Sequence, residues 1–235
     1  LVVALADKLE TLIGMFGIGN LPSGDKDPFA LRRHALGVGR MLVEADLPLQ
    51  ILPLIDSGIE AFAPGLLSLP AEKIREELSQ FLLDRLRGYF RDQGYAVQNI
   101  EAALAAGTLQ HWADIPRRLA ALKMFAGLAE APALAAANKR IGNILKKAEL
   151  AASDNNQPID TGLLQEAAEQ QLHAAMQTAL PQADAQFAAG DYTASLQTLA
   201  ALRAPVDSFF NDVMVNAEDL AVRNNRLALL HVLHQ

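Results

Sequence analysis

Cysteine is absent from the 235-residue chain, which excludes disulfides and thiolate metal ligands. Aromatic residues account for only 6% of the sequence, while alanine and leucine occur 42 and 39 times. Strands favour aromatic and β-branched residues, whereas alanine and leucine are among the best helix formers. The composition therefore predicts an all-α, multi-helical protein and excludes an all-β fold.

Long apolar runs are also absent from the sequence. No stretch approaches the roughly 18 to 20 apolar residues that span a bilayer, so we expect no membrane contact. The apolar start of the chain is interrupted by Asp7 and Lys8, which is typical of a helix cut from a longer chain and not of a signal peptide. Together with the missing cysteines, this pattern favours a cytoplasmic protein.

Basic residues are few, and their distribution matters more than the formal net charge of −7. Residues 111–147 carry seven basic and two acidic side chains, whereas residues 156–235 carry three and nine. A negative total disfavours indiscriminate binding of polyanions. Recognition of an anion would therefore rest on the basic middle segment and, nearer the end of the chain, on a few placed cations.

Apolar spacing and turn residues predict a series of helices. The pattern over 71–93 repeats at helical spacing and places one apolar face against a core. The glycines at 14, 17 and 19 follow the first helix, so we expect them to end it and not to cradle a phosphate. The other predicted helices cover 1–16, 97–106, 114–129, 132–151, 161–189 (kinked or split at Pro181), 192–203, 205–213 and 218–234. The polar stretch 153–158 is the best candidate linker.

Catalytic motifs are missing from the sequence. It contains no GxxxxGKS/T phosphate loop, no dinucleotide-binding fingerprint after a strand, no HExxH and no GxSxG. His231 and His234 lie three residues apart on one predicted helix, but no nearby carboxylate completes a metal site. We therefore expect this chain to hold no catalytic residues, metal or cofactor.

The helix expected over 132–151 carries the best candidate RNA-binding surface. Two pairs of cations lie seven residues apart on it, so two neighbouring stripes of the helix are basic. Such a surface can follow an RNA backbone, although a solvated basic end of a helix explains the same pattern. The candidate contacts on this helix are Asn138, Lys139, Arg140, Asn143, Lys146 and Lys147. Cations that extend the patch if the neighbouring helix packs alongside are Arg117, Arg118 and Lys123.

A pair of arginines follows the second predicted helix start. Asp27 is expected to be the N-cap of that helix, with Pro28 at its first position, and Arg32 and Arg33 come one turn later. An arginine fork there suits phosphate or subunit contact. The alternative is an ordinary capped helix with solvated or locally paired arginines.

The last predicted helix combines polar planar side chains with an apolar back, an arrangement that suits recognition of base edges or phosphates. The residues concerned are Arg223, Asn224, Asn225 and Arg226. Alternatively, Arg223 and Arg226 pair with nearby acids, of which the candidates are Asp212, Glu218 and Asp219. The aromatic residues expected in the core, and not as base-stacking platforms, are Trp112, Phe209 and Phe210.

Several co-linear stretches together resemble one known family. They are ALADKL at 4–9, FGIG at 16–19, DKDPFALRR at 25–33, AAANKRIGNIL at 135–145, LAALR at 199–203, PVDSFF at 205–210, VMV at 213–215 and RNNRL at 223–227. The sequence in these stretches resembles the β subunit of the bacterial tetrameric glycyl-tRNA synthetase. The resemblance extends over essentially the whole chain.

This resemblance implies a part of an α2β2 aminoacyl-tRNA synthetase that joins glycine to tRNA(Gly). The aminoacylation site, with its ATP and Mg, would lie on the α subunit, and the β subunit would handle tRNA. The chain would correspond to the C-terminal part of the β subunit. Residues 1–64 would end a domain similar to HD phosphohydrolases, 65–155 would form a helical body, and 156–235 an antiparallel anticodon-binding bundle of the DALR type.

Individual contacts follow less directly from the resemblance. Anticodon binding would rest on Arg203, Arg223 and Arg226, because the last module is acidic. Asp7 resembles the final metal-ligand aspartate of an HD domain, but the histidines that would complete such a site are not in this chain. A metal-dependent phosphohydrolase therefore rests on Asp7 alone. The remaining alternative is a helical scaffold for subunit assembly that makes no RNA contact.

Overall fold

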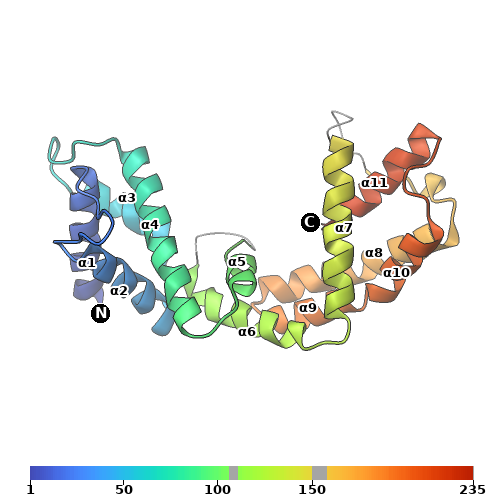
Figure 1. Ribbon diagram of the computed structural model, residues 1–235, viewed down its shortest axis with the longest axis horizontal. Coiled ribbons are helices and arrows are strands. Elements are labelled where there is room, and N and C mark those ends of the chain that lie inside the picture. The colour runs from blue at the N-terminus through green and yellow to red at the C-terminus, as the bar shows by residue number, and fades with distance from the viewer. Residues whose placement is uncertain (106–110, 150–157, 235) are drawn as a thin grey trace. The chain divides into compact units, whose positions relative to one another are not determined.

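The computed structural model describes residues 1–105, 111–149 and 158–234. Across these ranges the chain folds into helices joined by turns and forms no β-strand, which confirms the predicted all-α class. The chain divides into two compact units, residues 1–120 and 121–235, and the boundary falls inside one helix (Figure 1).

The first unit packs α1 against α2, α3 and α4. Its elements are α1 (Val2–Gly17), α2 (Leu31–Glu44), α3 (Ile51–Glu60), α4 (Ala71–Asp92), α5 (Val97–Ala105) and the 3-10 turn η1 (Trp112–Asp114). The helix predicted over 71–93 is confirmed as α4, which buries the predicted face through Ile74, Leu78, Leu82, Leu86 and Phe90. Trp112 is only 1% exposed and is a core residue as expected.

The end of α1 confirms the interpretation of its glycines as a helix stop. Gly19 has a φ of +74°, a conformation that glycine adopts without steric cost. Its N–H donates to the Phe16 carbonyl at 2.9 Å, and the Asn20 N–H donates to the Met15 carbonyl at 2.9 Å. These bonds satisfy carbonyls that the last turn of a helix leaves free.

The start of α2 differs from the prediction. The helix begins at Leu31, so Pro28 is not its first residue, and Ala30 with a φ of +52° occupies the N-cap position. Asp27 nevertheless satisfies the helix end, because its carboxylate accepts from the N–H groups of Leu31 at 2.8 Å and Arg32 at 3.0 Å. The Ala30 N–H donates to the Asp27 carbonyl at 3.1 Å, and this turn brings the carboxylate over the helix end.

The second unit is a bundle in which α8 packs against α9 and α10, and α11 packs against α7. Its elements are the end of α6 (Ile115–Ala126), α7 (Ala131–Glu149), η2 (Thr161–Leu163), α8 (Ala167–Ala188), α9 (Tyr192–Ala200), α10 (Arg203–Asp212) and α11 (Leu220–His234). Of the kink or split predicted at Pro181, the split is not seen, because α8 continues through this residue. It also begins later than predicted, because residues 161–163 form the separate turn η2.

The structure divides the chain differently from the three expected modules. The helix α7, assigned to a body region at 65–155, buries Ile141 and Leu145 in the same core as α8, α10 and α11. The expected boundary between residues 64 and 65 falls inside the first unit, where α4 packs on α1, α2 and α3. Of the predicted linker at 153–158, residues 153–157 lie outside the described residues.

Among the described residues, no single helix is both long and apolar enough to cross a membrane. Residues 112–126 and 131–148 meet a length and composition test only when they are taken together as a bent pair.

Candidate nucleic-acid interface

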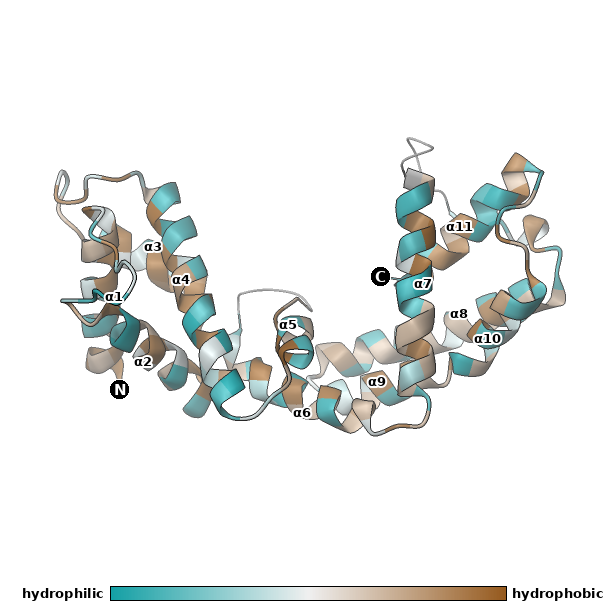
Figure 2. Cartoon of the chain, viewed as in Figure 1, coloured by the Kyte–Doolittle hydropathy of each residue, from teal (hydrophilic) through white to brown (hydrophobic). Residues whose placement is uncertain are grey.

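The helix α7 has one face in the core and one face in solvent. Ile141 and Leu145 are 2% and 4% exposed and fix the rotation of the helix on the bundle. The polar candidates are all exposed on the other side, namely Asn138, Lys139, Arg140, Asn143, Lys146 and Lys147. Hydrophobic and hydrophilic residues alternate along this helix in Figure 2. The apolar stripe therefore presents the predicted polar surface to solvent.

The cations of this surface form a local positive field in an acidic unit. Residues 121–235 contain twelve acidic and eight basic residues, and four of the eight basic residues lie on α7. Within the described part of the chain, no carboxylate lies within 4.0 Å of any of these four cations. Their charge is therefore available to an anionic ligand. A shallow hollow on this surface is lined by Ala136, Lys139, Arg140, Asn143, Ile144 and Lys147.

Arg140 differs from the three lysines because it lies against an aromatic ring. Its guanidinium carbon is 4.1 Å from the centroid of the Phe210 ring on α10. Phe210 in turn contacts Phe209 edge to face, with 5.5 Å between the ring centroids. Phe209 is fully buried, as predicted, whereas Phe210 is only partly buried and packs against the edge of the core.

Asn138 is engaged within the protein. Its Oδ1 lies 2.7 Å from Nδ1 of His234, where the ring N–H donates to the amide oxygen and connects α7 to α11. Among the α7 candidates, Asn138 therefore contributes to the packing of the bundle.

Arg226 on α11 is inside the bundle, which corrects its assignment as an RNA contact. It is 5% exposed, and its Nε donates to the carboxylate of Glu169, which is fully buried. Its Nη1 donates to the Met214 carbonyl at 2.7 Å. A guanidinium that is desolvated and paired in this way cannot reach a phosphate in solvent. The acidic partners suggested by the sequence are also wrong, because the partner is Glu169 on α8.

Asn225 is likewise a structural residue. Its Oδ1 accepts from the Asp160 N–H at 2.7 Å, and its Nδ2 donates to the Asp160 carbonyl at 2.9 Å. The side chain thus satisfies both backbone groups of one residue in the segment before η2. On the same helix, Arg223 is half-buried and Asn224 is exposed, so these two reach the surface. Arg203 on α10 is half-buried, and its Nε lies 3.5 Å from the carboxylate of Asp207.

Comparison with known proteins finds two matching family models and relatives that are similar over the whole chain. A family model described as glycyl-tRNA synthetase beta subunit matches residues 1–105, and one described as DALR anticodon binding domain matches residues 134–235. The glycine–tRNA ligase beta subunit of Delftia acidovorans is 58% identical over 234 residues, which cover 100% of this chain and 32% of the relative. The proteins of that name from Acidovorax sp. (strain JS42) and Paracidovorax citrulli are also 58% identical, over 99% of this chain and 31% and 32% of their own lengths.

Over its whole length this chain resembles glycyl-tRNA synthetase β subunits. It spans about a third of the length of the curated relatives that it matches. The resemblance inferred from the sequence motifs is thereby confirmed. The anticodon-binding match begins at residue 134 within α7 and includes α8 to α11, so the exposed cations of α7 lie inside it.

The first unit holds the remaining candidate arginines. Arg33 is exposed, and Arg32 donates through Nη2 to the Gly24 carbonyl at 2.5 Å. Arg117 pairs with Asp114, which neutralises part of its charge. Arg118 is only 8% exposed and its Nη1 donates to the Ala103 carbonyl at 3.4 Å. Arg118 is therefore a buried residue, which corrects its assignment as an RNA contact.

The histidines and acids of the chain do not gather into a metal centre in the described residues. There, no group of three or more His, Asp or Glu side chains is placed to hold a metal ion. Asp7, which carries the resemblance to an HD domain, is exposed on α1, and its backbone carbonyl accepts from the Thr11 hydroxyl at 3.0 Å.

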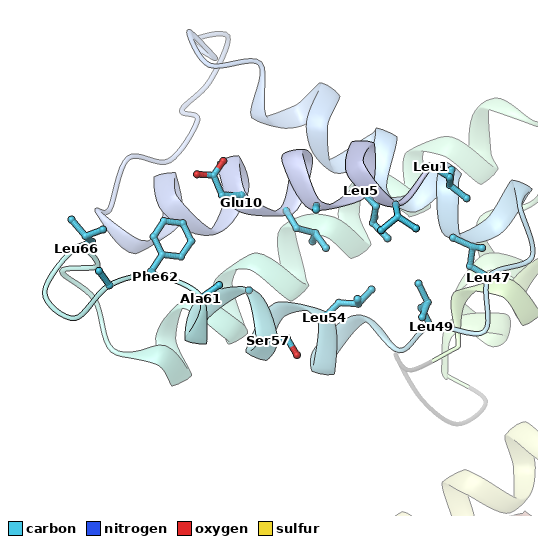
Figure 3. A pocket seen from close by; sticks show the side chains of 15 residues that line it. Leu1, Leu5, Glu10, Leu47, Leu49, Leu54, Ser57, Ala61, Phe62 and Leu66 are labelled. Atoms are coloured by element: carbon cyan, nitrogen blue, oxygen red, sulfur yellow. The ribbon is translucent and has the colours of Figure 1, made fainter.

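An apolar groove lies between α1 and α3 in the first unit. Its volume is about 760 Å³, and Glu10 and Ser57 supply the only polar side chains among the described residues that line it. Leu5 from α1 and Leu54 from α3 face the same groove, and Phe62 and Leu66 lie near the end of α3 (Figure 3). With so few polar groups, the groove suits contact with apolar side chains of protein and not recognition of a nucleic acid.

Proposed function

We propose that this chain is the tRNA-binding part of a glycine–tRNA ligase β subunit and supports ATP-dependent attachment of glycine to tRNA(Gly). The observation that carries the proposal is the exposed set of cations on α7, which form no ion pair with a described carboxylate and lie within the region that matches an anticodon-binding domain. The family match of residues 1–105 supports the same assignment. In this proposal the aminoacylation site, with its ATP and Mg, lies on the α subunit of a cytoplasmic α2β2 tetramer.

The role of the chain is then to bind and orient RNA. The ammonium groups of Lys139, Lys146 and Lys147 neutralise phosphates and release counterions, which supplies affinity and makes it depend on salt. The side-chain amide of Asn143 donates and accepts hydrogen bonds and so suits a base edge or ribose. Arg203, Arg223 and Asn224 supply further contacts from the same unit, and Arg32, Arg33 and Arg117 supply contacts from the first unit.

The proposal is tested by measuring how tightly the chain binds tRNA(Gly) at a series of salt concentrations. A second transcript that differs only in its anticodon is titrated in parallel. We expect tighter binding to tRNA(Gly) and a loss of affinity with salt, whose slope reports the number of neutralised phosphates. Equal affinity for the two transcripts would contradict anticodon recognition, and the absence of salt-dependent binding would contradict the RNA-binding role.

The apolar groove of the first unit favours a second function, as a scaffold for protein assembly. Because the chain spans about a third of its relatives' length, we propose that a segment from the other two thirds of the β subunit covers this groove. Burial of apolar area is the driving force expected for such a contact.

A substitution at Leu66 tests the scaffold role. Leu66 lines the groove and is 60% exposed, while Val97 on α5 is 57% exposed and lies outside it. We expect Leu66→Asp to leave the 235-residue chain stable and to lower the melting temperature of the full-length β subunit, and Val97→Asp to affect neither. If Leu66→Asp lowers the melting temperatures of the 235-residue chain and the full-length β subunit equally, a segment of the β subunit does not cover the groove. Destabilisation seen only in the assembled enzyme would assign the groove to the α subunit instead.

A further inference from the structure

Arg140 combines a charge with a planar group in the lining of the α7 hollow. Its guanidinium carbon lies over the Phe210 ring, 4.1 Å from the ring centroid. The residue as a whole is exposed. The contact with Phe210 is short enough for a cation–π interaction, which holds the guanidinium in place before any ligand arrives.

The neighbours of Arg140 are suited to the other parts of a nucleotide. Lys139, Asn143 and Lys147 line the same hollow and are all exposed. Residues three, four and seven positions apart lie on one side of a helix, so the amide of Asn143 is one turn from Arg140 and the ammonium of Lys147 is two turns away. The hollow thus offers a plane, a group that reads base edges, and flanking positive charges.

We propose that this hollow binds one unpaired RNA nucleotide. Its base stacks on the open side of the Arg140 guanidinium, with Phe210 as the third layer. The Asn143 amide hydrogen-bonds to the base edge, and Lys139 and Lys147 contact the flanking phosphates. This inference rests on the proposed RNA-binding function and adds the kind of RNA recognised, a single-stranded segment whose base leaves its own stack.

The chemistry of arginine distinguishes this proposal from simple attraction of phosphates. A guanidinium is planar and stacks on aromatic surfaces, whereas a lysine ammonium is a compact point charge. Unpaired bases stack on such planes, but bases inside a duplex are not accessible to them. Removal of the plane should therefore weaken binding of single-stranded RNA selectively, even when the charge is kept.

The conservative variant Arg140→Lys is the central test. The 235-residue chain is titrated with the anticodon stem-loop of tRNA(Gly) and with the same hairpin after a complementary oligonucleotide has paired its loop. Because Arg140→Lys removes the stacking contact of one base, we expect it to weaken binding of the free loop roughly 10-fold. Its salt slope should stay at the wild-type value, and its affinity for the paired loop should change by less than about twofold. Phe210→Leu should reproduce the selective loss, with circular dichroism to confirm the fold.

The possible failures of the two proposals are distinguishable. If Arg140→Lys binds the free loop as tightly as the wild type, or if its affinity for both probes falls equally, the stacking site is overturned while tRNA binding stands. If the wild-type chain binds neither probe in a salt-dependent manner, the proposed RNA-binding function fails together with the stacking site.

Discussion

The guanidinium of Arg226 on α11 donates to the carboxylate of Glu169, and both side chains are buried in the helical bundle. Glu169 also accepts from the Glu166 N–H at 2.8 Å, as part of the capping box at the start of α8. Arg226 reaches the Met214 carbonyl as well. One ion pair therefore joins α11, the beginning of α8 and the segment between α10 and α11.

Replacement of Arg226 by alanine should destabilise the bundle strongly. The change leaves the Glu169 carboxylate buried without its partner, and an uncompensated buried charge costs about 3 to 5 kcal/mol. Urea unfolding of the chain measures this loss. The double variant Arg226→Met/Glu169→Leu should recover much of it, because neither charge then remains in the core. A loss below about 1 kcal/mol for Arg226→Ala would show that the pair does not stabilise the fold.

Asn225 and Asn224 form a matched pair of test sites on α11. Asn225→Ala removes both hydrogen bonds to the Asp160 backbone and leaves those groups partly buried, which should cost about 1 to 3 kcal/mol. Asn224→Ala, at an exposed position, should change stability by no more than about 0.5 kcal/mol. Hydrogen exchange at the Asp160 amide reports the contact directly. If exchange there is equally fast in the wild type and in Asn225→Ala, the contact is absent in solution.

Glu44 should make the stability of the first unit depend on pH. The Glu44 carboxylate accepts hydrogen bonds from the Arg40 guanidinium at 2.7 Å and from the Tyr89 hydroxyl at 2.9 Å. These two hydrogen bonds hold the pKa of Glu44 below its ordinary value. The contribution of Glu44 to folding stability is therefore complete above the pKa of a glutamate in the unfolded chain, about 4.3. This stabilisation is lost as the pH falls from there through the lower pKa of Glu44 in the folded protein.

The variant Glu44→Gln isolates this effect. Urea midpoints of the wild type and the variant should differ near neutral pH and converge in acid, below the range in which Glu44 titrates. A difference that stays constant down to strongly acidic pH would exclude Glu44 as the group responsible.

The sequence predicted helices well where one pattern decided the outcome. In α4 and α7 the apolar residues repeat at helical spacing, and burial of that stripe fixes both the helix and its exposed face. At α2 the local rule for Asp27-Pro28 gave the wrong start. The turn at Ala30 lets the Asp27 carboxylate cap the helix from further upstream, a geometry that residue preferences do not encode.

The candidate site was predictable in part for the same reason. The α7 cations lie on a helix whose other face must be buried, so their exposure follows from the sequence. The burial of Arg226 does not, because it depends on Glu169, 57 residues earlier in the chain. Arg118 is similar, since its contact is the backbone carbonyl of Ala103 on another helix. Tertiary contacts of this kind leave no local pattern.

The most direct test of the α7 surface is the salt dependence of tRNA(Gly) binding by the variant Lys146→Ala/Lys147→Ala. Arg91→Ala is the matched control, because Arg91 is an exposed cation at the end of α4 and is not a proposed RNA contact. Each neutralised phosphate contributes about 0.7 to 0.9 to the slope of log affinity against log salt concentration. The double variant, which loses two cations, should therefore bind more weakly, with a slope about 1.4 to 1.8 smaller than that of the wild type. The control should keep the wild-type affinity and slope. If the double variant and the control behave alike, α7 is not the RNA-binding surface of this chain.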